Sequence, residues 1–117
     1  MNDIIDNIGR LYSAGISMSV GTDYMFEAEP YQTAGIPIHE LQLLYKAGLS
    51  VEEIVKASTI DTANIIGVGR DLGSIEVGRI ADIIATDSEI DSTFSALSPE
   101  HIVFVMHYGT IVVNRCL

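Results

Sequence analysis

A carboxylate directly follows a short alternating stretch near the start of the 117-residue chain. In the segment ISMSVGTD, apolar residues at 16, 18 and 20 alternate with serines at 17 and 19, and Asp23 comes just after Gly21. Alternation with period two is typical of a β-strand with one apolar face, which the glycine ends. Gly-Thr-Asp is ordinary turn chemistry, so on these residues alone Asp23 is interpreted as an N-cap or turn residue after a strand. Whether the acid has a further role, and with which partners, stays open at this point.

Few other side chains in the sequence are candidates for chemistry. The three histidines are His39, His101 and His107, and they form neither His-x-His nor His-Glu-x-x-His. His39 opens a predicted helix, either as a polar first-turn residue or as a contact to substrate, whereas His107 is interpreted as a hairpin residue. Cys116 is the only cysteine, so it forms no internal disulfide; we interpret it as inert and expect a reducing, cytoplasmic location.

The first half of the chain predicts helices around the alternating stretch. Apolar residues at helical spacing predict a helix over 2–14 that ends at Gly15, and the strand 16–20 follows at once. A loop over 24–37 precedes a second helix over about 38–47, with Gly48 as its stop. A helix that is connected to a strand by a single glycine is typical of an α/β unit with a parallel sheet.

Local capping signals predict the next two helices. Ser50 and Glu53 form the pattern of a capping box, which opens a helix containing residues 54–57. Asp61 is predicted to cap a short following turn through residues 65 and 66, and Gly67 ends it.

From about residue 72 the sequence becomes rich in short β-type runs. Asp82 and Asp87 bracket one predicted strand, and a helical turn is expected at about 93–97. The segment IVFVMHYGTIVVN predicts a hairpin that turns at Tyr108-Gly109. The chain is therefore divided into an α/β part over 1–67 and a β-rich part over 68–117.

Composition excludes several classes of partner. The formal net charge is −10 with only six Lys and Arg residues, which argues against nucleic acid and against anionic membrane surfaces. No apolar run approaches the roughly 18–20 residues that span a bilayer. The N-terminal segment MNDIIDNIGR carries acids where an export signal carries basic residues.

Four segments, in order, carry a resemblance to a known family: GISMSVGTD, HELQLLYKAGLSVEEIVKASTIDTANIIG, LGSIEVGRIADIIATD and VMHYGTIVVN. Together they resemble the C-terminal end of metal-dependent amidohydrolases, most closely the branch of imidazolonepropionase-like enzymes and metal-dependent dipeptidases. The resemblance covers about residues 3–114. Tyr24 stands where the family often has a small residue, and Val77-Gly78-Arg79 stands where it often has Pro-Gly-Lys.

The resemblance implies a fold and a site. That family has a (β/α)₈ barrel with a small β-sandwich built from both chain ends. Residues 16–20 then match the last barrel strand and 72–114 the C-terminal strands of the sandwich. Asp23 matches the family's last metal-site residue, which binds a divalent metal, expected to be zinc, and shuttles the proton of the attacking water. Active sites of such barrels lie at the C-terminal ends of their strands, which agrees with this placement.

One carboxylate does not complete a catalytic zinc site, which needs about three protein ligands. In the family, the other ligands come from barrel strands that this sequence does not contain. We therefore expect the chain to hold no metal tightly by itself and to be inactive without the missing barrel. The complete enzyme would hydrolyse a C–N bond in an amide, cyclic amide or dipeptide. The alternative is a non-enzymatic remnant that folds as an oligomer or with a partner chain, because isolated apolar strands invite association.

Overall fold

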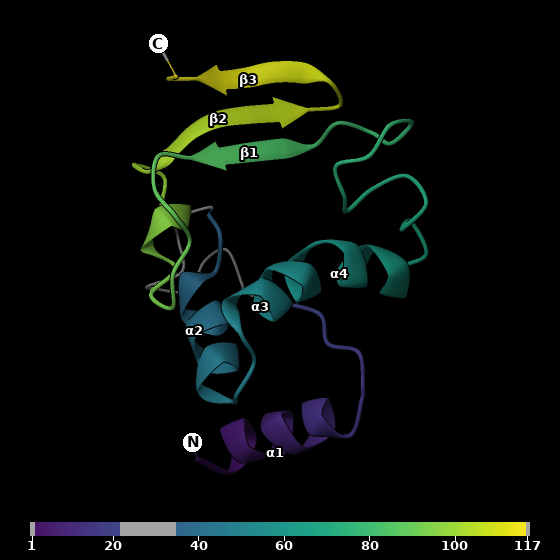
Figure 1. Ribbon diagram of the computed structural model, residues 1–117, viewed down its shortest axis with the longest axis vertical. Coiled ribbons are helices and arrows are strands. Elements are labelled where there is room, and N and C mark those ends of the chain that lie inside the picture. Colours follow the sequence, from purple (N-terminus) through teal and green to yellow (C-terminus); the bar gives the residue numbers. More distant parts are fainter. Residues whose placement is uncertain (1, 22–34, 117) are drawn as a thin grey trace, which may run out of the picture.

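The computed structural model describes residues 2–21 and 35–116, in which four helices precede a small antiparallel sheet (Figure 1). This arrangement confirms the α/β class. The helices are α1 (Asn2–Ser13), α2 (Ile38–Lys46), α3 (Val51–Ser58) and α4 (Ile60–Ile65). The strands are β1 (Ile83–Thr86), β2 (Ile102–His107) and β3 (Thr110–Asn114), and a 3₁₀ turn, η1 (Ser95–Leu97), lies between β1 and β2.

Helix ends follow the local sequence signals. Gly15, Gly48 and Gly67 all have positive φ angles just after helices, which is the left-handed conformation that glycine adopts without steric cost. At the start of α3 the Ser50 hydroxyl accepts a hydrogen bond from the Glu53 backbone N–H at 3.2 Å, and the Glu53 carboxylate accepts one from the Ser50 N–H at 2.7 Å. The predicted capping box is confirmed.

Replacing Ser50 with alanine is expected to lower the free energy of unfolding by about 1 kcal/mol, because the substitution removes the side-chain acceptor of the capping box. Urea denaturation at neutral pH measures this loss. Ser95→Ala is the matched control, because Ser95 is the first residue of η1 and its hydroxyl accepts from the Thr93 hydroxyl at 3.0 Å rather than from a backbone N–H of the turn. Equal effects of the two substitutions would contradict the assignment.

The predicted cap of α4 is wrong. Thr59 occupies the position before the helix, and Asp61 lies inside the first turn, where its carboxylate is 3.7 Å from the Lys56 ammonium group. The Thr59 hydroxyl donates instead to the Val55 carbonyl at 2.7 Å, so α4 begins without a side-chain cap. Because α4 follows α3 with a single residue between them, the preceding turn of α3 supplies the acceptor for this hydroxyl.

The predicted strand over 16–20 is not a strand in this structure, where these residues have no regular secondary structure. A strand is stabilised by pairing with a neighbour, and within the described ranges no other segment pairs with residues 16–20. The predicted alternation persists in part, since Met18 and Val20 are half-buried and Ser17 and Ser19 are exposed, whereas Ile16 is exposed as well.

The sheet has the order β1-β2-β3, with both pairs antiparallel. Residues 108 and 109 connect β2 to β3, with His107 opposite Thr110 and φ angles of 52° at Tyr108 and 75° at Gly109. Positive φ at both central residues is the geometry of a type I′ hairpin turn. The predicted hairpin is confirmed.

Replacing Gly109 with valine is expected to lower the free energy of unfolding by about 1–3 kcal/mol, because a β-branched residue is strained at positive φ. A Cβ atom at this position would meet no atom of the described residues within 4 Å, so the effect is assigned to backbone strain. Gly21→Val is the matched control, since a Cβ atom at Gly21 also meets none of the described atoms within 4 Å and its φ is not in the left-handed region. An unchanged melting temperature in Gly109→Val would rule out the turn.

The core lies between α2, α3 and the segment around η1, below the sheet in Figure 1. Its central cluster is formed by Leu41, Leu49, Ile54, Phe94 and Leu97. Partly buried residues of the N-terminal segments, Tyr12 and Val20, pack against it. By contrast, none of the residues of β1, β2 or β3 is fully buried. Helices and η1 therefore supply the core, and the sheet adds little to it.

None of the helices in the described ranges is long and apolar enough to cross a membrane.

Candidate functional site

The segment that leads to Asp23 ends beside the core. Val20 packs on the core cluster and lines a cavity between the helices and the sheet. Asp23, the predicted catalytic and metal-binding residue, lies outside the described residues, as does Tyr24. The described chain resumes at residue 35, and Ile36 and Pro37 line the same cavity as Val20. Described residues on both sides of the segment 22–34, which contains Asp23, therefore line this cavity.

His39 is the second residue of α2, and its side chain is exposed. It follows Pro37, which occupies the cap position of the helix and provides no side-chain hydrogen bond there. His39 is therefore close in sequence to the wall of the cavity, at the first turn of α2. Its predicted contact with substrate stays a prediction.

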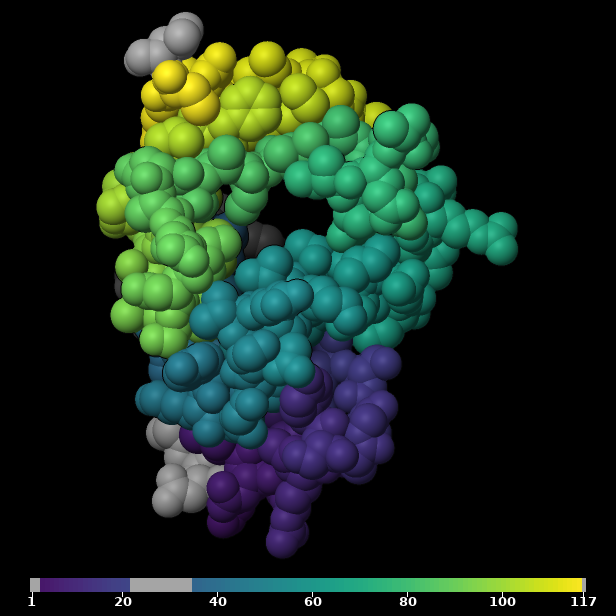
Figure 2. Space-filling model, in the orientation of Figure 1, coloured from purple at the N-terminus to yellow at the C-terminus, as the bar shows by residue number. Residues whose placement is uncertain are grey.

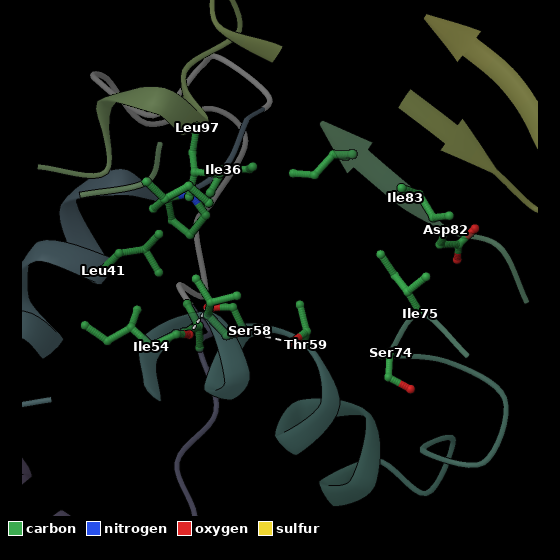
Figure 3. Close-up of a pocket in the computed structure, with 16 residues that line it drawn as sticks. Ile36, Leu41, Ile54, Ser58, Thr59, Ser74, Ile75, Asp82, Ile83 and Leu97 are labelled. Atoms are coloured by element: carbon green, nitrogen blue, oxygen red, sulfur yellow. Dashed lines mark hydrogen bonds between the residues drawn. The ribbon is translucent and has the colours of Figure 1, made fainter. Parts of the chain in front are cut away.

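The cavity has a volume of about 540 Å³ and is lined mainly by aliphatic side chains (Figure 3). One wall comes from α3 and the residue after it, with Ile54, Val55, Ser58 and Thr59, and the opposite wall comes from Asp82, Ile83 and Ile84 at β1. The hydroxyls of Ser58 and Thr59 each donate to a carbonyl of α3 at 2.7 Å. These polar groups are satisfied within their own helix, so the cavity presents a mostly apolar surface.

Two histidine–aspartate pairs hold the ends of β1 against β2. Asp82, just before β1, accepts hydrogen bonds from His107 Nδ1 at 3.0 Å and from the Tyr108 backbone N–H at 2.8 Å. Asp87, just after β1, accepts one from His101 Nδ1 at 2.9 Å. The position of His107 at the end of β2 agrees with its interpretation as a hairpin residue. Because β1 and β2 are antiparallel, the start of β1 lies beside the end of β2, and Asp82 therefore comes close to His107.

Both acids were predicted at the ends of a strand, but their bonds to the two histidines were not predicted. The signal was present in the sequence, because His101 and His107 flank the next predicted strand just as Asp82 and Asp87 flank theirs. Both imidazoles bond to acids that flank β1, so the contacts that the structure shows for them are within the sheet region.

The described residues do not supply a metal site. Across 2–21 and 35–116, no three side chains of the metal-ligating types His, Cys, Asp and Glu come together. The donor set needed for zinc is about three protein ligands and an open position. The residues described here do not fit such an ion, and Asp23 is the one predicted ligand that lies outside them.

Lowering the pH is expected to weaken the β1–β2 pair through Asp87. The hydrogen bond from His101 holds the pKa of the Asp87 carboxyl below its usual range, with a further contribution from Ser88. A carboxyl whose pKa is lower in the folded state stabilises the fold above its unfolded pKa, and this contribution is lost as the pH falls through the folded pKa. Melting temperatures between about pH 6 and pH 3 should therefore fall less steeply in Asp87→Asn than in the wild type.

Asp71→Asn is the matched control for this pH profile, since Asp71 is an exposed acid in the turn after α4. Its profile should follow the wild type. Parallel profiles for wild type and Asp87→Asn would show that the His101–Asp87 pair does not contribute to stability.

Comparisons with known proteins agree on one fold. The structure superimposes on a solved amidohydrolase with a TM-score of 0.80 and 31% sequence identity, covering 97% of this chain and 26% of that one. It also superimposes on a solved Xaa-Pro dipeptidase with bound methionine, with a TM-score of 0.79 and 25% identity, covering 95% of this chain and 26% of that one. The fold is therefore that of an α/β segment of amidohydrolases.

The sequence comparisons give the family. Imidazolonepropionase from Shouchella clausii strain KSM-K16 is 31% identical over 109 residues, which are 92% of this chain and 24% of the relative. The model of the amidohydrolase family matches residues 2–112. The chain belongs to the amidohydrolase family, and the resemblance stated from its sequence segments is confirmed. The chain spans about a quarter of the length of the relatives that it matches.

Proposed function

We propose that this chain forms the C-terminal part of a metal-dependent amidohydrolase that hydrolyses a C–N bond in an amide, cyclic amide or dipeptide. The observation that carries the proposal is the family match over residues 2–112, in a chain that spans a quarter of its relatives. Its relatives include an imidazolonepropionase and a Xaa-Pro dipeptidase, so both cyclic amides and dipeptides are reasonable substrate classes.

In this proposal residues 1–67 complete the end of a (β/α)₈ barrel, and residues 68–117 supply strands to a composite β-sandwich. Residues 16–20 form the last barrel strand once neighbouring strands pair with them. The alternating pattern of these residues and the half-burial of Met18 and Val20 support this role. Asp23 then lies at the C-terminal end of the strand, where barrel enzymes have their active sites.

Asp23 is proposed as the catalytic carboxylate and as one ligand of a divalent metal, with zinc as the expected ion. Members of the family generally bind such a metal. When bound, such a metal would supply a water of lowered pKa for the hydrolysis, and the Asp23 carboxylate would hold that water's proton and pass it on. His39 is proposed to contact the substrate, because it lies in the first turn of the helix that follows the segment containing Asp23.

The function is tested with a chimera in which this chain replaces the matching quarter of the Shouchella clausii imidazolonepropionase. With added Zn²⁺, we expect the chimera to hydrolyse imidazolonepropionate or Xaa-Pro dipeptides and the 117-residue chain alone to be inactive. A folded, zinc-loaded chimera that cleaves neither substrate class would contradict the proposal. That result would favour the alternative, a non-enzymatic protein that folds as an oligomer or with a partner chain.

A further inference from the structure

One side chain of α2 bonds to a segment that is distant in sequence. Gln42 Nε2 donates a hydrogen bond to the Thr93 carbonyl at 2.9 Å, although the two residues are 51 positions apart. Figure 1 draws the segment that leads into η1 beside α2, and Figure 2 shows the green atoms of this segment directly against the blue surface of α2. The bond therefore fixes α2 to the connection between β1 and β2.

The acceptor of this bond belongs to a tightly hydrogen-bonded turn at 91–95. The Asp91 carboxylate accepts from the Thr93 backbone N–H at 2.9 Å, and the Ser95 backbone N–H donates to the Thr93 hydroxyl at 3.3 Å. Hydrogen bonds from the hydroxyl and then from the backbone N–H of Thr93 hold the pKa of the Asp91 carboxyl below its usual range. The carboxyl is therefore ionised at neutral pH and accepts these bonds.

The backbone of this turn is strained at the next residue. Phe94 has a φ of 55°, and the peptide bond that precedes it carries the Thr93 carbonyl. A bulky residue seldom adopts this left-handed conformation, which the fully buried ring of Phe94 stabilises here. Strained backbone of this kind persists where the surroundings hold it, and it clusters at functional sites. The direction of the Thr93 carbonyl is thus fixed from both sides.

The helix on the donor side depends on contacts of this kind. Pro37 occupies the cap position of α2 and provides no side-chain hydrogen bond, and the helix has only nine residues. A short helix without a cap frays in its first turn unless tertiary contacts hold it. In this half of α2, Leu41 is buried in the core and Gln42 bonds to Thr93. These two contacts hold the first two turns in place.

His39 lies one turn before Gln42. Residues three apart on a helix are neighbours on its surface, so the two side chains share one face of α2. Gln42 is half-buried and His39 is exposed. A movement of the first turn of α2 would therefore move the imidazole that is proposed to contact the substrate.

From this juxtaposition we propose that Gln42 is a positioning residue, which holds the first turn of α2 against the turn at 91–95 and so places His39 for substrate. The β-rich part of the chain then takes part in substrate binding without contacting the substrate. This role rests on the proposed function for the substrate and for the contact of His39. The bond and the turn that accepts it are properties of this chain alone.

A purely structural bond between the two parts of the chain is the alternative. Loss of such a bond would lower stability but would leave the affinity for substrate unchanged. Loss of a positioning bond would raise KM through His39. Kinetics therefore separate the two roles, which stability measurements alone do not.

The first test is hydrogen exchange of α2 in the 117-residue chain. Gln42→Met keeps the length of the side chain but removes the N–H donor. We expect the amides of residues 40–44 to exchange about three- to tenfold faster in this variant, the effect of one lost hydrogen bond. Lys46→Met, an exposed residue in the last turn of the same helix, is the matched control and should leave this exchange unchanged. Unchanged exchange in Gln42→Met would overturn the proposal.

The second test is steady-state kinetics of the chimera with the Shouchella clausii imidazolonepropionase, on the substrate that it hydrolyses. We expect Gln42→Met to raise KM about three- to tenfold and to change kcat by less than about twofold, because a weakened substrate contact acts on binding. Gln42→Lys restores a donor and should recover most of the wild-type KM. A wild-type KM in Gln42→Met would leave only the structural role and overturn the proposal.

A double-mutant cycle tests whether Gln42 acts through His39. If it does, Gln42→Met should not raise the KM of His39→Ala further, whereas additive effects would contradict the positioning role. Asp91→Ala loosens the turn that holds the acceptor and should raise KM in the same direction as Gln42→Met. Glu89→Ala, an exposed acid of the same segment, is its matched control and should leave KM unchanged.

The role of Gln42 and the proposed function can fail separately. An active chimera in which Gln42→Met behaves as wild type keeps the function and overturns the positioning role. A folded, zinc-loaded chimera without activity contradicts the function and any role in substrate binding, and the exchange of α2 still decides whether the bond holds the helix. If Gln42→Met does not fold, Gln42→Glu takes its place in both tests, since it keeps the shape of the side chain and removes the donor.

Discussion

Replacing Phe94 with alanine is expected to lower the free energy of unfolding by about 3–5 kcal/mol, the usual loss for a buried phenylalanine. The Phe94 ring is fully buried and belongs to the central cluster with Leu41, Leu49 and Ile54. Those residues belong to α2, α3 and the segment between them, whereas Phe94 precedes η1, so its ring joins the segment between β1 and β2 to the helices. Truncation to alanine would leave a cavity where the ring packs, and the segment between β1 and β2 would lose this contact with the helices.

Tyr108→Ala is the matched control for Phe94→Ala. Phe94 and Tyr108 are the two described non-glycine residues with positive φ, at 55° and 52°. Both are aromatic, but the Phe94 side chain is 0% exposed and the Tyr108 side chain is 69% exposed. Tyr108→Ala therefore replaces an aromatic residue at a similarly strained backbone position without removing a side chain from the core. Urea denaturation should show a loss of less than about 1 kcal/mol for Tyr108→Ala. Similar losses for both variants would show that strain rather than burial decides their effect.

Local signals in the sequence predicted much of this fold. The capping box at Ser50 and Glu53 depends on two side chains and the backbone of one turn, and the hairpin at Tyr108-Gly109 depends on two φ angles. Such features depend on no residue that is distant in sequence. The types of about four to six neighbouring residues are therefore enough to predict them. The Asp61 cap was wrong because α3 and α4 are separated by one residue, and Thr59 bonds back into α3.

Features that depend on distant residues could not be predicted from the same signals. Phe94 follows no helical or strand period, so nothing in its neighbourhood marks it as the centre of the core. The pairs Asp82–His107 and Asp87–His101 require the register of β1 on β2. Residues 16–20 have the pattern of a strand, but a strand also needs a neighbour, and its proposed neighbours belong to the rest of an amidohydrolase. For the same reason the roles of Asp23 and His39 stay predictions.

The largest expected effect on activity is that of Asp23→Asn in the complete enzyme. We expect the substitution to lower kcat by about 10²–10⁴-fold, the usual contribution of a general acid or base. Asparagine keeps the shape of the side chain but removes the charge and the proton acceptor. The assay uses the chimera with the Shouchella clausii imidazolonepropionase and saturating Zn²⁺. Asp6→Asn, an exposed acid on α1, is the matched control and should leave kcat unchanged.

The 117-residue chain by itself is expected to bind zinc only weakly. Without the other ligands, Asp23 should bind zinc no more tightly than a surface acid, because a single carboxylate leaves the ion most of its water shell. Calorimetric titration of the 117-residue chain with Zn²⁺ should therefore give the same weak binding in wild type and Asp23→Asn. Tight, stoichiometric zinc in the free chain that disappears in Asp23→Asn would show a site complete within this chain. A chimera whose kcat is unchanged by Asp23→Asn would remove Asp23 from the catalytic mechanism.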